Sequence, residues 1–307
     1  MTFRLGIALA VTMIFWSSAF PAITETVRYF KPGAMALLRF GVASAALLLY
    51  GAIARIRVPQ RRDLGGIFVC GLCGVSIYHV LLNYGQLSVD PGTAAFLINL
   101  SPVFTALIAR FVLGERLRPL GWVGILVSFC GVPLIAAAKD GQMEFNPHAL
   151  FIVGSALSSA IYVVVQKRYL GRYTSLEFTT YIIVAGTLCV LFYAPQMVKD
   201  IQTAPPRATL LVVYLGLFPA ALAYVTWTIV LAAMPASRAI SFLYLVPPLA
   251  VVFGWVFLGE LPHPLAWVGA ALAIAGVIIV NRYGRVETAR PVLVNEPNTP
   301  SGAKLAD

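Results

Sequence analysis

Charged residues are scarce in this sequence. Only 11% of its 307 residues are Asp, Glu, Lys or Arg, whereas 60% are hydrophobic and the mean hydropathy is +0.86. Soluble globular domains contain about 25% charged and about 45–50% apolar residues. The composition therefore excludes a soluble globular protein and predicts one that resides in a lipid bilayer.

Several chemistries lack the residues that they need. No apolar segment carries Asp or Glu in its middle third. The sequence therefore lacks the membrane carboxylate that an exporter of lipophilic cations needs to exchange them for protons. No intramembrane cluster of Lys or Arg could offset the charge of a sugar phosphate. The sequence also lacks the motifs of an intramembrane hydrolase, namely a nucleophile with its base, an Asp dyad or an H-E-x-x-H zinc site. Cys70 and Cys73 are interpreted as packing residues of an apolar helix. We therefore expect no enzyme, no metal site and no cofactor.

Long hydrophobic runs occupy most of the chain. A helix of about 20 apolar residues spans a hydrocarbon core of about 30 Å, and ten such segments are predicted. They are Leu5 to Ile23, Ala34 to Ile53, Leu64 to Leu87, Gly92 to Leu113, Leu120 to Ala138, His148 to Val165, Phe178 to Ala194, Leu210 to Leu231, Ala239 to Leu258 and Leu265 to Val280. Residues 282–307 are polar and contain several prolines, so we expect a disordered tail.

The two halves of the chain resemble each other. The stretch "RFVLGERLRPLGWVG", Arg110 to Gly124, returns as "WVFLGELPHPLAWVG", Trp255 to Gly269, with eight of fifteen positions identical. The chain is therefore predicted to contain two five-helix repeats, residues 1–140 and 145–281. Because five is odd, the second repeat enters the membrane in the opposite sense, which makes an inverted repeat.

Positive charge indicates which ends face the cytoplasm, because short cytoplasmic loops are rich in Lys and Arg. With the N-terminus inside, the inner segments and their flanks contain sixteen of the 22 Lys and Arg, and the outer loops contain five. Both termini are therefore expected in the cytoplasm. This sidedness also explains the net charge of +10 without a nucleic-acid partner.

These features resemble a known family. Two five-helix halves, each with a proline in its fourth helix, then "LGE", then "PLxWVG" and a glycine-rich last helix, are similar to the EamA group of the drug/metabolite transporter superfamily. The segment "LLRFGVASAALLLY" also resembles that family, and the likeness covers roughly residues 1 to 281. It implies an all-α integral membrane protein that moves small metabolites, often exporting amino acids, by alternating access.

Polar residues at helical spacing indicate a pathway, because a polar side chain that faces lipid is costly. In the third predicted helix, Ser76, His79 and Asn83 share one face, and Tyr224 is the repeat partner of His79. The residues expected to line a substrate site between the halves are Trp16, Ser76, His79, Asn83, Asn99, Tyr162, Tyr224 and Tyr244.

Four further residues allow two interpretations each. Pro102 and Pro247 lie at matching positions, where a kink would free carbonyls at a binding site or would be filled by neighbouring side chains. His79 could carry a coupling proton or be satisfied by a neighbour. The side chain of Arg39 could reach the outer headgroups, the reading we favour, or hold a substrate carboxylate.

Two glutamates end helices at matching turns, Glu115 and Glu260, and both are expected to bond the N-terminal amides of the next helix. Thr174 and Glu177 have the spacing of a capping box ahead of an apolar run.

These observations predict a secondary transporter of the cell inner (plasma) membrane. Its substrate is expected to be a small neutral or zwitterionic metabolite, such as an amino acid, that it exports. Its expected partners are this solute and the lipid bilayer. The alternatives are a non-transporting receptor or scaffold, or an exporter of lipophilic drugs. Proton coupling is an option, and the sequence leaves the oligomeric state open.

Overall fold

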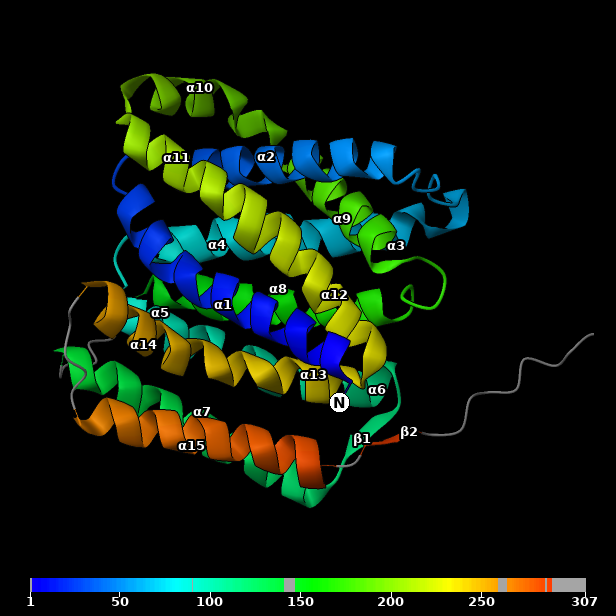
Figure 1. Cartoon of the computed structure of the whole chain (residues 1–307), viewed down its shortest axis with the longest axis vertical. Helices are drawn as coiled ribbons and strands as arrows, with labels where there is room; N and C mark the ends of the chain where they lie inside the picture. The colour runs from blue at the N-terminus through cyan, green and yellow to red at the C-terminus, as the bar shows by residue number, and fades with distance from the viewer. Residues whose placement is uncertain (1, 90, 141–146, 259–263, 285, 289–307) are drawn as a thin grey trace, which may run out of the picture.

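The computed structural model describes residues 2–89, 91–140, 147–258, 264–284 and 286–288. Nearly all of its elements are helices that lie side by side (Figure 1). The α-helices are α1 (Phe3–Thr26), α2 (Pro32–Ile53), α3 (Leu64–Gly71), α4 (Tyr78–Gly85), α5 (Pro91–Ile98), α6 (Ser101–Val112), α7 (Pro119–Asp140), α8 (Ala149–Lys167), α9 (Ser175–Cys189), α10 (Ala194–Thr203), α11 (Pro206–Leu215), α12 (Ala223–Ala233), α13 (Ala236–Ser241), α14 (Val246–Leu258) and α15 (Pro264–Tyr283). Short 3-10 or π segments are η1 (Arg61–Asp63), η2 (Leu72–Ile77), η3 (Leu191–Tyr193), η4 (Gly216–Leu222) and η5 (Phe242–Leu245), and the strands are β1 (Glu115–Leu117) and β2 (Val286–Thr288).

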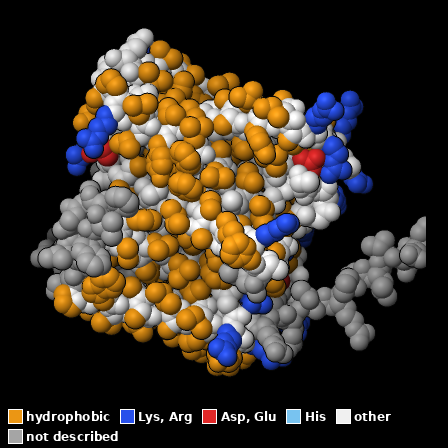
Figure 2. Space-filling view, viewed as in Figure 1, with side chains coloured by type: hydrophobic (Ala, Val, Ile, Leu, Met, Phe, Trp, Pro, Cys, Tyr) orange, Lys and Arg blue, Asp and Glu red, His pale blue; other side chains and the backbone are white. Residues whose placement is uncertain are grey.

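The described chain has the helices of a membrane protein. Seven are long and apolar enough to cross a bilayer, or eight if α9 and the following η3 and α10, bent by 51°, are one span. Two shorter apolar helices cover Phe96–Val112 and Pro119–Val132. Figure 2 shows a broad hydrophobic belt over these helices, with Lys and Arg gathered mainly at the right-hand end of the bundle. The protein is therefore predominantly helical and embedded in a membrane, as predicted.

Contacts between the two halves of the chain follow one pattern. Helix α1 packs against α12 and α14, and α8 packs against α4 and α6. Helix α2 lies against α9, and α7 lies against α15. If α1 is matched with α8, α4 with α12 and α6 with α14, the first four contacts map onto one another in pairs. If α2 is matched with α9 and α7 with α15, the other two contacts each join a helix to its own counterpart.

The α7–α15 pair packs closely because glycines meet on both helices. A Cβ on Gly124 would lie 2.8 Å from the main-chain oxygen of Gly276, and one on Gly131 would lie 2.5 Å from that of Gly269. Ser128 donates a hydrogen bond of 2.9 Å to the Ala273 carbonyl. Small residues at four-residue spacing thus allow the two backbones to approach.

Two π-helical segments occur at matching positions, and sequence periodicity did not reveal them. A π turn shifts the i→i−4 hydrogen-bond pattern to i→i−5, and carbonyls in and near both segments accept side-chain hydrogen bonds from the other half. In η2 the Cys73 carbonyl accepts from Ser158, at 2.8 Å. In η4 the Pro219 carbonyl accepts from Trp16 Nε1, at 3.1 Å.

The helical pattern is also interrupted just before both matching prolines. The chain turns at Asn99 and Leu100 between α5 and α6, and η5 separates α13 from α14 immediately before Val246 and Pro247. The α5–α6 pair and the α13–α14 pair run in opposite directions across the bundle (Figure 1). Each half therefore contributes one broken helix.

Two regions differ from the expectations. Residues 195–203 were expected to link two helices, but they belong to α10, which contains Lys199 and Asp200. In the predicted tail, α15 continues to Tyr283 and Val286–Thr288 pairs with β1 in an antiparallel ladder. Main-chain hydrogen bonds across a ladder do not depend on apolar side chains, so the polar composition did not reveal this strand.

Candidate functional site: a cavity between the two halves

A cavity lies where helices from both halves meet. It is lined by α1 and α2, by the η2–α4 and α5–α6 regions, and by α8, α12, α13, η5 and the start of α14. Its volume is about 80 Å³, which exceeds the roughly 10–15 Å³ that a single water molecule requires. The cavity is therefore large enough to admit water or a small polar group.

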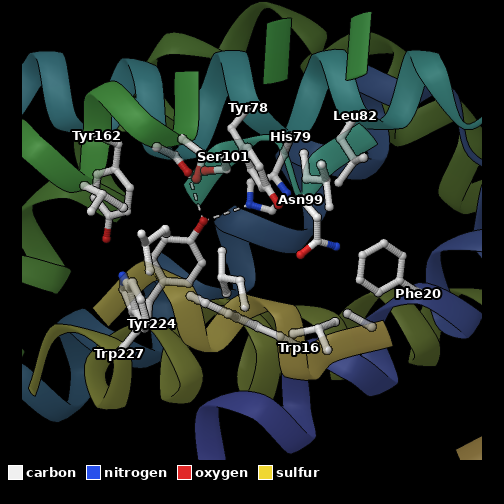
Figure 3. A pocket seen from close by; sticks show the side chains of 18 of the residues that line it. Trp16, Phe20, Tyr78, His79, Leu82, Asn99, Ser101, Tyr162, Tyr224 and Trp227 are labelled. Atoms are coloured by element: carbon white, nitrogen blue, oxygen red, sulfur yellow. Dashed lines mark hydrogen bonds between the residues drawn. The ribbon is translucent and has the colours of Figure 1, made fainter. Parts of the chain in front are cut away.

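A chain of hydrogen bonds crosses one wall of the cavity. Arg39 Nη1 lies 3.4 Å from His79 Nδ1, and His79 Nε2 lies 2.9 Å from the Tyr224 hydroxyl. That hydroxyl donates to the Gly74 carbonyl at 2.9 Å (Figure 3). Because a guanidinium can only donate, Nδ1 must accept and Nε2 must carry the hydrogen. The geometry thus requires a neutral His79.

Aromatic rings and aliphatic side chains form the remaining walls. The Trp16 ring lies edge-on to Tyr224, with centroids 5.8 Å apart, and 5.3 Å from Trp227. Tyr162 lies 6.1 Å from Tyr224. In Figure 3 the Asn99 amide points toward the side of the cavity formed by Trp16 and Phe20. Among the described lining residues none is acidic and the only charged side chain is that of Arg39.

The structure brings together five of the eight residues predicted to line a site. Trp16, His79, Asn99, Tyr162 and Tyr224 line this one cavity although they come from five separate regions of the chain.

Ser76, Asn83 and Tyr244 are buried but do not line the cavity. Ser76 donates to the Gly186 carbonyl of α9 at 2.8 Å, and Asn83 donates to the Pro32 carbonyl of α2 at 3.0 Å. The expected stripe assumed a regular helix, but Ser76 lies in η2, where the wider π turn changes the direction of its side chain relative to His79.

Other lining residues were missed or given a different role. Arg39 was expected to reach the outer headgroups, but its side chain is 3% exposed and lines the cavity. Trp227 lies one helical turn after Tyr224, a spacing that could have revealed it. Ser101 directly precedes Pro102 and also lines the cavity.

At the end of the bundle where α1 begins, the two halves are tied together. Glu115, which is 4% exposed, accepts hydrogen bonds from the Ala236 amide at 2.9 Å and from the Ser237 amide at 3.0 Å. The Ser237 hydroxyl donates to the same carboxylate at 2.7 Å. Arg168 donates to the Val112 carbonyl at 3.1 Å.

The architectural role expected for Glu115 is therefore corrected in one respect. Its carboxylate caps α13 of the other half, not the next helix along the chain, because the start of α13 is the helix terminus that packs against the end of α6. Glu260 lies outside the described residues. The capping box of Thr174 and Glu177 is confirmed.

Known proteins share both the sequence pattern and the fold. The EamA-like transporter family matches this chain twice, over residues 4–137 and 146–282. The chain belongs to the EamA-like transporter family. Both matched segments contribute to the walls of the cavity.

Individual proteins are similar to this chain along nearly its whole length. A protein of Streptantibioticus cattleyicolor named "Probable terminal-alkyne amino-acid exporter" is 42% identical over 90% of this chain and 92% of its own length. The uncharacterized transporter YdfC of Bacillus subtilis is 34% identical over 93% and 94%. A crystal structure at 22% identity has a TM-score of 0.74, covering 92% of this chain and 98% of that one. The EamA-like chain is therefore a transporter.

Proposed function

We propose that this EamA-like protein is a secondary transporter that exports a small neutral or zwitterionic metabolite, of the amino-acid class, by alternating access between its two halves. The observation that carries the proposal is the cavity itself, which residues of both family segments line with polar and aromatic groups. A solute bound there would contact both halves. Rocking of one half against the other would then expose it to either side.

The proposed topology has ten spans in two inverted repeats, residues 1–140 and 145–281, in the inner (plasma) membrane with both termini in the cytoplasm. Four observations support it. The contacts between halves map onto one another, the broken helices run in opposite directions, and α1 begins at the same end of the bundle as α15 finishes (Figure 1). Lys and Arg gather mainly at that end (Figure 2).

The substrate class follows from the charge of the cavity lining. The described lining contains one cation and no carboxylate, which disfavours lipophilic cationic drugs and favours a solute that carries a carboxylate or no net charge. The name of the Streptantibioticus cattleyicolor relative supports an amino acid and the direction of export.

Proton coupling through His79 is part of the proposal, and the hydrogen-bond pattern restricts it. Both ring nitrogens are engaged, one with Arg39 and one with Tyr224. A second proton on His79 therefore requires Nδ1 to separate from Arg39. Coupling would then occur only in a conformation in which this contact is broken.

Transport is tested by reconstituting the full chain in proteoliposomes and measuring uptake and counterflow. The panel contains L-leucine, L-methionine, the terminal-alkyne amino acid L-propargylglycine and a lipophilic cationic dye, each with and without a pH gradient. We expect saturable counterflow of at least one amino acid and none of the dye. Flux of the dye alone would favour a drug exporter, and absence of all flux in protein that binds an amino acid would favour a receptor.

The role of His79 is tested with His79→Ala and with the control variant Tyr84→Phe. Tyr84 is 36% exposed, lies on the same helix and does not line the cavity. Coupling through His79 predicts that His79→Ala transports equally at all pH gradients, whereas Tyr84→Phe keeps the wild-type pH dependence. An unchanged pH dependence in His79→Ala would contradict it.

A further inference from the structure

Arg39 is a buried cation without a carboxylate partner in the described part of the chain. Its side chain is 3% exposed, on α2, and lines the cavity. Its guanidinium carbon lies 5.3 Å from the centroid of the Phe40 ring, and Nη1 contacts His79. Nε has no hydrogen-bond partner.

Burial of Arg39 without a carboxylate partner would destabilise the fold if Arg39 had only a structural role. Removing a charge from water costs several kcal/mol unless an opposite charge or a full set of hydrogen bonds replaces the solvent. A neutral His79 supplies one acceptor for a group with five N–H donors. The guanidinium edge that carries Nε is not used by His79, and this edge matches the two oxygens of a carboxylate.

A second polar group in the cavity also lacks a partner. The Ser101 hydroxyl is in a residue that is 1% exposed, lines the same cavity and has no hydrogen-bond partner. Buried hydroxyls in proteins are normally satisfied. Two unsatisfied polar groups in the wall of one cavity, on α2 and at the start of α6, indicate that a polar ligand binds there.

We propose that Arg39 binds the carboxylate of the transported solute, so that the substrate class is restricted to carboxylate-bearing metabolites. This inference rests on the proposed transport function. The hydrogen-bond chain from Arg39 through His79 and Tyr224 to Gly74 makes His79 a positioning residue that holds the guanidinium in the wall of the cavity. The apolar part of the solute packs against Trp16 and Phe20.

The test compares an amino acid with an analogue that lacks only the negative charge. Proteoliposomes with wild-type protein are loaded with L-leucine or L-propargylglycine, and inhibition of counterflow is measured with the amino acid, its primary amide and 4-methylpentanoate. We expect the amides to inhibit at least tenfold more weakly than the acids, and 4-methylpentanoate to inhibit. Equal inhibition by acid and amide would overturn the inference, while the transport function would stand.

The variant Arg39→Gln tests whether Arg39 causes the preference for the acid over the amide. A hydrogen bond to a charged group contributes about 1.5–3 kcal/mol, so KM for the amino acid should rise about 10- to 100-fold. The preference for acid over amide should collapse, which a purely structural role would not cause. Arg39→Lys should retain part of this preference, and Arg110→Gln, which removes an exposed cation outside the cavity, should behave as wild type.

The outcomes separate the two proposals. If Arg39→Gln is misfolded by size-exclusion chromatography, the wild-type comparison of acid and amide still decides. If folded Arg39→Gln keeps the wild-type preference, Arg39 is not the carboxylate site. If wild-type protein carries none of the amino acids, the proposed transport function fails and this inference fails with it.

Discussion

Replacement of Glu115 should release the contact that ties the two halves together at the N-terminal end of the bundle. In Glu115→Ala the amides of Ala236 and Ser237 and the Ser237 hydroxyl lose a buried, charged acceptor. Each hydrogen bond to a charged group contributes about 1.5–3 kcal/mol, and loss of a helix cap costs about 0.5–2 kcal/mol. Because the three bonds share one carboxylate and are not additive, we expect a total of about 3 kcal/mol.

This energy should appear as local opening of α13. A change of about 3 kcal/mol corresponds to a factor on the order of 100 in an opening equilibrium. Hydrogen–deuterium exchange of the reconstituted protein, followed by mass spectrometry of peptides that cover Ala236–Ser241, measures it directly. Faster exchange confined to this segment is the expected result.

A matched control lies next to Glu115 on the same strand. Arg116 is exposed, and its main chain pairs with β2 in a way that does not require its side chain. Arg116→Ala should therefore leave the exchange of Ala236–Ser241 unchanged. If Glu115→Ala also leaves it unchanged, the carboxylate does not hold the two halves together and the reasoning is wrong.

Two further predictions concern stability and are checked by thermal unfolding in detergent. Gly71→Val should destabilise the protein by about 1–3 kcal/mol, because a Cβ there would lie 2.6 Å from a main-chain oxygen of α9. The control Gly65→Ala, where a Cβ would meet open space, should change the stability little. A melting temperature equal to wild type in Gly71→Val would contradict this close approach. Burial raises the pKa of Tyr173, so its hydroxyl stays protonated and donates to Asp63 at 2.7 Å. Tyr173→Phe should therefore cost about 1–3 kcal/mol, while the exposed Tyr50→Phe is neutral; equal melting temperatures of the two variants would show that the hydroxyl contributes nothing.

Much of the fold follows from local sequence because the bilayer imposes simple requirements. Every backbone group in lipid must be paired within the protein, so an apolar run of sufficient length forms a helix. Small residues at four-residue spacing, such as Gly124 and Ser128, permit close helix packing, and the structure shows such packing between α7 and α15. The capping box at Thr174 was likewise predictable, since it involves residues three positions apart.

The candidate site could be predicted only in part. His79 and Tyr224 were recognised because a polar side chain in a membrane helix faces the bundle interior or a water-filled cavity. Both line the cavity. Ser76 was placed with them by a period of 3.6 residues, which the π turn of η2 does not obey. A small change in helical period is enough to turn a side chain from the cavity to α9.

What the sequence by itself determined is the apolar spans, their duplication and the sidedness of positive charge, because each depends on a local exchange of water for lipid. Tertiary structure alone decided that Arg39 lies in the cavity wall beside His79 and that Glu115 caps α13 of the opposite half. These partners lie 40 residues apart in the first case and 121 in the second. Hydrogen bonds at such separations depend on how the helices pack, and no local pattern encodes them.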